Sequence, residues 1–209
     1  MSQYSLVKES DTHYAVIKDG FSTYNIVFKK SAWSCSCPAR GKCKHLDMLP
    51  SEAKVKRYSH IEIEEAYSKI ENILWPYKHT ICGSYRRCAP DCKDIDIVIL
   101  CDAHSFEQVC LQLQHSGFFK YIAGGEKKIH GTINGIPVDI DRVEDPNHYA
   151  AHTLYRTGPV ALNIRMRKRA QECGFVLNEY TNAASEAEIF ERLGMSYIPL
   201  LMRQQQCSY

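Results

Sequence analysis

Apolar and polar residues alternate along two stretches near the N-terminus. HYAVIKDG, from residue 13, and TYNIVFKK, from residue 23, are rich in β-branched and aromatic residues. Asp19-Gly20, at the end of the first stretch, is a typical hairpin turn. The pattern therefore predicts two antiparallel strands that form a β-hairpin.

A helical period replaces the alternation between residues 51 and 75. Apolar residues recur there three or four positions apart, at Ile63, Ala66, Tyr67, Ile70 and Leu74. This spacing places them on one face of a helix, and Pro76 ends the run. We expect a domain boundary near residues 50–60.

Strand-like and helical stretches alternate through the middle of the chain. The predicted strands are HTICG, DIDIVIL, KKIHGTI and IPVDIDRV, and a predicted helix, SFEQVCLQLQHSG, lies between the second and the third of them. Asn134-Gly135 joins the last two strands as a hairpin turn. This order predicts a mixed sheet with a helix on one face.

The C-terminal part is expected to be helical. One helix follows Thr157-Gly158-Pro159, with the proline in its first turn, and a last helix covers SEAEIFERLG after a short turn at residues 178–180. The fold class is therefore α/β, of the α+β kind. We expect three domains, at residues 1–55, 56–145 and 146–209.

The composition is that of an ordinary folded protein. Of the 209 residues, 44% are hydrophobic and 24% are charged, which excludes a disordered or fibrous chain. The net charge of +2 is too small to indicate a nucleic-acid partner by itself. The sequence has neither an apolar run of membrane-helix length nor a signal peptide, so we expect an intracellular protein with no membrane partner.

The ten cysteines fall into two groups. Seven are scattered, and since nothing directs secretion we expect them to be free thiols. Cys35, Cys37 and Cys43 instead lie close together and beside His45. Cys-x-Cys, five residues and Cys-x-His provide four soft ligands at the short spacing that tetrahedral Zn²⁺ prefers. We expect one structural zinc ion, and a chance cluster of thiols is the alternative.

Candidate metal-binding carboxylates lie on two predicted strands. Asp94 and Asp96 flank one residue at the start of an apolar strand, so both project from the same face. Asp139 interrupts an apolar stretch on a later strand. Three such carboxylates would supply the oxygen ligands that two Mg²⁺ ions need. Asp-x-Asp alone is common, however, and more often marks the wet face of an edge strand.

The segment GSYRR, residues 83–87, favours the metal site over that simpler explanation. Glycine permits a close approach of the backbone, and serine and arginine side chains bind phosphate oxygens. A solvated charge pair would explain Arg86 and Arg87, but not the glycine and serine placed before them.

GSYRR, six intervening residues and DID resemble the nucleotidyltransferase signature of the family X DNA polymerases. Downstream, LYRTGPVALNIRMR resembles the family's segment around its tyrosine, threonine and glycine, and SEAEIFERLGMSYIPLLMR resembles its C-terminal helix and tail. The similarity covers roughly residues 75–203 in the same order. It implies a polymerase beta-like palm followed by a small C-terminal subdomain.

The resemblance implies roles for individual carboxylates. Asp94, Asp96 and Asp139 would be the metal ligands, and Asp139 would also be the base for the primer hydroxyl. Asp141 is the alternative third ligand, because it lies on the same strand face. We prefer Asp139 because its apolar neighbours match the family pattern.

Other residues are implied to bind nucleotide or DNA. Those expected at the triphosphate are Gly83, Ser84 and Arg87. Those expected at the sugar and base of the nucleotide are Tyr155, Thr157, Gly158 and Asn163. Those expected at the DNA, with Arg167 on the template side, are Arg165, Arg167, Lys168 and Arg169. A plain solvated helix face is the usual alternative for the last group.

The chain also departs from the family. Many members have an aromatic residue where this chain has Arg156, so the usual sugar discrimination is in question. No lyase domain or helix-hairpin-helix glycine motif is recognisable. A polymerase without these elements must hold its DNA in another way.

The cysteine–histidine segment resembles a SWIM zinc finger over about residues 10–50. Basic and aromatic residues around it would suit phosphate contact and base stacking. They are Lys29, Lys30, Trp33, Arg40, Lys42 and Lys44. A solubilising surface or a protein-docking module is the alternative.

The expected activity is that of a monomeric DNA-directed DNA polymerase that adds deoxynucleoside triphosphates to a primer 3′-hydroxyl. Its cofactors would be two Mg²⁺ or Mn²⁺ ions and one Zn²⁺, and its DNA a short gap under repair or an open primer-template. A template-independent nucleotidyltransferase would use the same aspartates. A non-catalytic, zinc-dependent nucleic-acid-binding protein is the third possibility.

Overall fold

The computed structural model describes residues 4–10, 13–18, 21–29, 32–39, 43–49 and 56–203. The chain divides into two compact units, residues 1–56 and residues 57–209. Each unit has its own sheet and its own apolar core. Among the residues just given, no helix is both long and apolar enough to span a bilayer.

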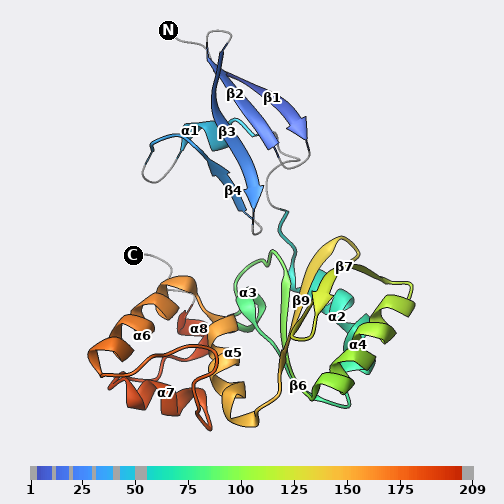
Figure 1. Ribbon diagram of the computed structural model, residues 1–209, viewed down its shortest axis with the longest axis vertical. Coiled ribbons are helices and arrows are strands. Elements are labelled where there is room, and N and C mark those ends of the chain that lie inside the picture. The colour runs from blue at the N-terminus through green and yellow to red at the C-terminus, as the bar shows by residue number, and fades with distance from the viewer. Residues whose placement is uncertain are drawn as a thin grey trace. The chain divides into compact units, whose positions relative to one another are not determined.

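The N-terminal unit is a four-stranded antiparallel sheet with one short helix (Figure 1). Its elements are β1 (Tyr4–Ser10), β2 (His13–Lys18), β3 (Phe21–Lys29), β4 (Ala32–Cys35) and α1 (Lys44–Asp47). The predicted hairpin corresponds to β2 and β3, while its turn at residues 19–20 lies outside the described residues. Strands β1 and β4 extend the hairpin on either side.

The C-terminal unit contains a five-stranded mixed sheet in the order β5-β6-β9-β8-β7. Its strands are β5 (Lys78–Ile81), β6 (Ile95–Leu100), β7 (Phe119–Gly125), β8 (Lys128–Ile133) and β9 (Ile136–Val143). Only β6 and β9 pair in parallel, and the other neighbours are antiparallel. The sequence did not predict β7, which is glycine-rich at its end and exposes much of its length.

Helices α2 (His60–Leu74) and α4 (Ala103–His115) cover one face of this sheet (Figure 1). The helical period predicted for residues 51–75 is confirmed in α2, since Ile63, Ile70 and Leu74 are fully buried. The helix begins after Ser59, whose side chain accepts from the Glu62 amide while the Glu62 carboxylate accepts from the Ser59 amide. This capping box fixes the start of the helix.

The other face of the sheet is covered by α5 (Tyr149–Thr157), whose Tyr149 packs beside Val98 and Val143. Through Ala151 and Leu154, α5 also contributes to the core of the helical subdomain that follows it. The remaining elements are α3 (Gly83–Arg86), the short 3₁₀ helix η2 (Pro146–His148), α6 (Val160–Glu172), α7 (Glu186–Arg192) and α8 (Leu200–Arg203). Pro159 caps α6 instead of lying in its first turn as predicted, because the helix begins one residue later.

Candidate active site

The candidate catalytic carboxylates meet on the two parallel strands. Asp96 on β6 and Asp139 on β9 are direct partners in the strand pairing, and Asp94 immediately precedes β6. Side chains alternate between the faces of a sheet, so Asp96, Asp139 and Asp141 share one face. The other face carries the apolar core formed by Ile95, Ile97, Val138 and Ile140. The strands therefore present carboxylates on the face away from α2 and α4.

Gly83 lies against this carboxylate face. Its φ is 62°, and an added β-carbon would lie 2.4 Å from Oδ2 of Asp96. The neighbouring Cys82 amide donates to the Asp96 carbonyl oxygen at 2.7 Å. Only glycine combines this backbone conformation with so close an approach. Gly83–Arg86 of the GSYRR segment form α3, which begins directly beside Asp96, and Arg87 is its C-cap.

The carboxylates raise one another's affinity for protons. Burial, reinforced by the negative charges of Asp94 and Asp139, raises the pKa of Asp96 to about 7. Burial and the charge of Asp139 also raise the pKa of Asp94, although Lys93 opposes this. A group of partly buried carboxylate oxygens that raise one another's pKa suits a hard divalent cation.

Asp139 is held by two cationic or hydrogen-bonding side chains from β8. Lys128 Nζ donates to Asp139 Oδ2 at 2.6 Å, and His130 Nδ1 lies 2.5 Å from Asp139 Oδ1. Burial alone would raise the pKa of Asp139, but these two contacts lower it below its ordinary value. Asp139 is therefore kept as a carboxylate.

Asp141, the alternative third ligand, has a different partner. It is only 5% exposed, and one of its oxygens forms an ion pair with Nε of Arg156 on α5. Nη1 of the same guanidinium lies 3.9 Å from Oδ1 of Asp96. Both carboxylates therefore have cationic or hydrogen-bonding partners, but only Asp139 is the direct partner of Asp96 in the strand pairing.

The two arginines of GSYRR reach the C-terminal end of α5. Arg87 donates from Nη1 to the Thr157 carbonyl oxygen, and Arg86 donates to the Thr157 hydroxyl at 2.8 Å. Arg86 also forms an ion pair with Glu186, which in turn binds the fully buried Arg203 at 2.6 Å. Arg87, Thr157 and Gly158 are therefore neighbours.

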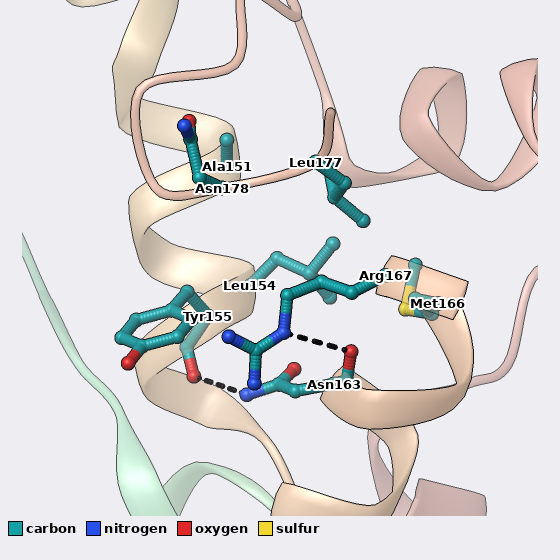
Figure 2. Close-up of a pocket in the computed structure, with 8 residues that line it drawn as sticks. All are labelled: Ala151, Leu154, Tyr155, Asn163, Met166, Arg167, Leu177 and Asn178. Carbon is teal, nitrogen blue, oxygen red and sulfur yellow. Dashed lines mark hydrogen bonds between the residues drawn. The ribbon is translucent and has the colours of Figure 1, made fainter. Parts of the chain in front are cut away.

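Tyr155, Asn163 and Arg167 line a small pocket between α5 and α6 (Figure 2). Asn163 Nδ2 donates to the Tyr155 carbonyl oxygen at 2.8 Å, and the Arg167 guanidinium lies 5.9 Å from the centre of the Tyr155 ring. Three residues of the proposed nucleotide and template contacts are thus neighbours.

The basic residues of α6 are not equivalent. Arg165, Arg167 and Lys168 are exposed. Arg169 donates from Nε to the Leu193 carbonyl oxygen at 3.0 Å and pairs with Glu172 at the same distance. The guanidinium of Arg169 therefore has structural partners within the subdomain, although its side chain is exposed like those of the other three.

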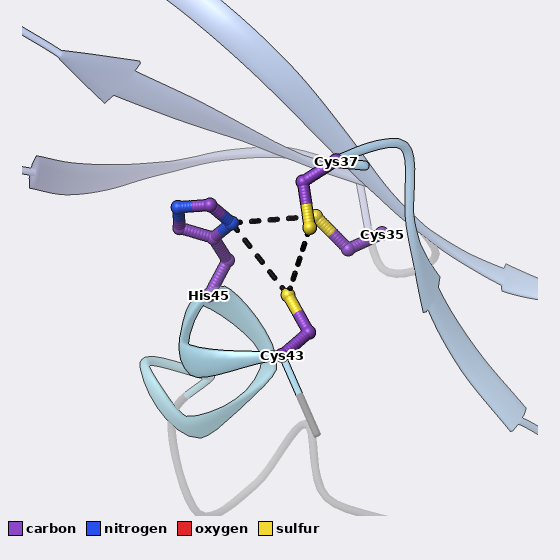
Figure 3. Close-up of side chains that lie close together, drawn as sticks. All are labelled: Cys35, Cys37, Cys43 and His45. Atoms are coloured by element: carbon purple, nitrogen blue, oxygen red, sulfur yellow. Dashed lines mark hydrogen bonds between the residues drawn. The ribbon is translucent and has the colours of Figure 1, made fainter. Parts of the chain in front are cut away.

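The N-terminal unit gathers the predicted zinc ligands (Figure 3). One ligand atom from each of Cys35, Cys37, Cys43 and His45 lies within 4.8 Å of the others. Cys37 and Cys43 sulfurs are 3.2 Å apart, and His45 Nδ1 is 3.7 Å from the Cys35 sulfur and 3.6 Å from that of Cys43. Tetrahedral zinc with its usual bond lengths places ligand atoms about 3.5–3.8 Å apart. The cluster fits one zinc ion.

Local structure explains how the cluster forms. The end of β4 supplies Cys35, the following bend supplies Cys37, and α1 with its N-cap supplies His45 and Cys43. Burial lowers the pKa of His45, which keeps its imidazole neutral for coordination. Trp33 is partly buried and packs edge-on against Tyr14 of the unit's core. Lys30, Arg40 and Lys42 of the predicted basic surface lie outside the described residues.

Lys128 and His130 were missed by the sequence reasoning, although a signal for them exists. A two-residue turn at Asn134-Gly135 pairs residue 133 with residue 136, and counting outwards pairs His130 with Asp139 and Lys128 with Asp141. The hairpin prediction therefore already implied a histidine beside the third carboxylate.

Two family models match the chain. The DNA polymerase beta palm matches residues 54–129, and the DNA polymerase beta thumb matches residues 152–204. Asp94 and Asp96 lie within the first match, while Asp139 lies between the two. The chain therefore has palm and thumb domains of the DNA polymerase beta type, preceded by a small cysteine-rich β module. These domains support a nucleotidyltransferase of family X.

Proposed function

We propose that the protein is a family X DNA-directed DNA polymerase that fills short gaps during DNA repair. The observation that carries the proposal is the position of Asp96 and Asp139 as partners on parallel strands, with Gly83 and α3 directly against Asp96. We assign residues 1–55 to a zinc module, residues 56–145 to the palm and residues 146–209 to the nucleotide- and template-binding subdomain.

The carboxylate face fits divalent cations, because its donors are hard carboxylate oxygens that raise one another's pKa by their negative charges. Asp94, Asp96 and Asp139 would hold two Mg²⁺ ions, with Mn²⁺ as a substitute. When bound, such ions neutralise charge that develops on the attacking and leaving oxygens of phosphoryl transfer.

The residues around this face have separate tasks. Asp139, kept ionised by Lys128 and His130, accepts the proton of the primer 3′-hydroxyl at a carboxylate oxygen. Ser84 and Arg87 orient the triphosphate, since serine and arginine side chains bind phosphate oxygens. These residues would hold the triphosphate in line with the primer 3′-hydroxyl. This alignment speeds the reaction, because the two reactants no longer have to meet and orient by diffusion.

The end of α5 and the subdomain that follows it would select and place the nucleotide. Tyr155, Thr157 and Gly158 line the sugar, and Asn163 faces the base from the minor-groove side. Arg167 contacts the template strand, and the exposed Arg165 and Lys168 bind DNA phosphates beside it. The contact of Arg87 with Thr157 supports the nucleotide assignment, because it links the triphosphate residue to the sugar segment.

The zinc module would bind DNA, because no lyase domain or helix-hairpin-helix motif is recognisable in the sequence to do so. Cys35, Cys37, Cys43 and His45 bind one structural zinc ion, and Lys44 is exposed beside them. Because Trp33 packs against Tyr14, its ring is less available to stack on a base. The zinc module would therefore bind DNA mainly through phosphate contacts.

The test is nucleotide incorporation on three substrates: a one-nucleotide gap, an open primer-template and an unpaired primer. We expect incorporation of the templated nucleotide, most rapidly at the gap. Extension of the unpaired primer at a similar rate would favour the template-independent nucleotidyltransferase. Binding without incorporation in Mg²⁺ or Mn²⁺ would favour a non-catalytic DNA-binding protein.

A further inference from the structure

One guanidinium lies between two carboxylates of the candidate active site. Arg156 pairs through Nε with Asp141, while its Nη1 is 3.9 Å from Oδ1 of Asp96. The side chains of Arg156 and Asp141 are 24% and 7% exposed, so water screens their charges only weakly. Arg156 is therefore close enough to affect any cation at Asp96.

Asp141 holds this guanidinium more closely than Asp96 does. The Arg156–Asp141 contact is a direct ion pair, whereas the Arg156–Asp96 contact is at the outer limit for one. Lys128 and His152 also approach Asp141, but only to 4.0 Å and 3.9 Å. Of these three neighbours of Asp141, Arg156 is the nearest.

A cation at Asp96 and the guanidinium of Arg156 carry like charges. Two like unit charges about 4 Å apart repel each other much more strongly in a partly buried site than in bulk water, because the effective dielectric constant is lower there. If Arg156 bound Asp96 directly, it would exclude the cation. If it left altogether, the cation would lose a repulsive neighbour and the free Asp141 carboxylate would attract it.

We propose that Asp141 is a positioning residue that holds Arg156 beside the metal site, and that this pair sets the affinity of Asp96 for divalent cations. The inference rests on the proposed metal site at Asp94, Asp96 and Asp139. It assigns Asp141 to the arginine instead of to a metal ion.

The test is the binding of Mn²⁺ to the zinc-loaded full chain, without DNA or nucleotide, measured from the electron paramagnetic resonance signal of free Mn²⁺. Arg156→Met should tighten binding by about tenfold or more, because it removes a nearby positive charge. Asp141→Asn should weaken it by about tenfold, because it frees Arg156 to bind Asp96. The double variant should return close to the wild-type affinity, since the charge of the pair is zero in both proteins.

Two control variants separate charge from packing. Arg156→Lys keeps the positive charge and should stay within about threefold of wild type. Arg192→Met removes a cation of α7 that binds the Asn182 carbonyl oxygen, and should leave Mn²⁺ binding unchanged. Thermal unfolding identifies variants that do not fold, and if Asp141→Asn is among them, Arg156→Met and the double variant decide the question.

A merely structural pair would give a different result. Weaker Mn²⁺ binding by both Arg156→Met and Asp141→Asn would overturn the inference while leaving the metal site intact. Equal Mn²⁺ binding by wild type and Asp96→Asn would instead show that the carboxylate site does not bind the ion. That result would overturn the proposed function, and this inference with it.

Discussion

A β-carbon on Gly83 would lie 2.4 Å from Oδ2 of Asp96. This distance is far below van der Waals contact, and the positive φ of Gly83 adds strain for any other residue. The backbone of Gly83 at the start of α3 therefore packs directly against the Asp96 carboxylate, with no space for a side chain between them.

Gly83→Ala should therefore reduce nucleotide incorporation by about a hundredfold, because it displaces the Asp96 carboxylate by a sizeable part of an ångström or more. Gly117→Ala is the matched control. Gly117 also has a positive φ, of 75°, but an added β-carbon there meets no atom within 4 Å. The Gly117→Ala variant should therefore be less stable than wild type but incorporate nucleotides at the wild-type rate. Equal turnover in the two variants would contradict the close fit at Asp96.

Glu186→Gln should destabilise the C-terminal unit by about 3–5 kcal/mol, because it deprives the buried Arg203 of its carboxylate. Glu172→Gln removes a carboxylate from the exposed pair with Arg169 and should cost less than about 1 kcal/mol. Urea unfolding of the two variants measures the difference. Similar losses would show that burial of the Glu186–Arg203 pair has no special effect.

Cys43→Ser should abolish zinc binding, because it removes a buried ligand from the four-residue cluster. Elemental analysis should find one zinc ion per wild-type chain and none per variant. Cys173→Ser changes an exposed free cysteine and should keep the zinc. Full zinc content in Cys43→Ser would contradict the assigned ligand set.

Removal of residues 1–55 should leave nucleotide incorporation possible, because residues 57–209 form a separate compact unit with its own core. DNA affinity should fall, and the dependence of binding on salt concentration should become shallower by the number of lost phosphate contacts. Filter binding at several salt concentrations measures both. Unchanged affinity for gapped DNA would favour a protein-docking role for the zinc module.

Much of the fold followed from local pattern. The alternation in IPVDIDRV and the turn at Asn134-Gly135 predicted β8 and β9 correctly, and the period of Ile63, Ala66 and Ile70 predicted α2. These signals succeed because one face of each element is buried. Strand β7 and helix α5 gave weaker signals, since β7 ends in glycines and is largely exposed while α5 is buried over most of its surface.

The sequence predicted which residues form the candidate site, but not the ion pairs that these residues make with other side chains. Asp94, Asp96 and Asp139 follow from motif and resemblance, and the four zinc ligands follow from spacing alone. The pair of Asp141 with Arg156 joins β9 to α5, the helix that covers the carboxylate face of the sheet, and no local pattern specifies it. The same holds for Arg86 and Glu186, which are a hundred residues apart.

The most direct test is the rate of templated incorporation into a one-nucleotide gap in Mg²⁺, compared among wild type, Asp96→Asn, Asp139→Asn and Asp141→Asn. Wild type should insert the nucleotide complementary to the template. Asp96→Asn and Asp139→Asn should be slower by orders of magnitude, because each removes charge from the metal site, and Asp141→Asn should retain more activity than either. Absence of templated incorporation by wild type, or undiminished incorporation by Asp96→Asn, would contradict the account.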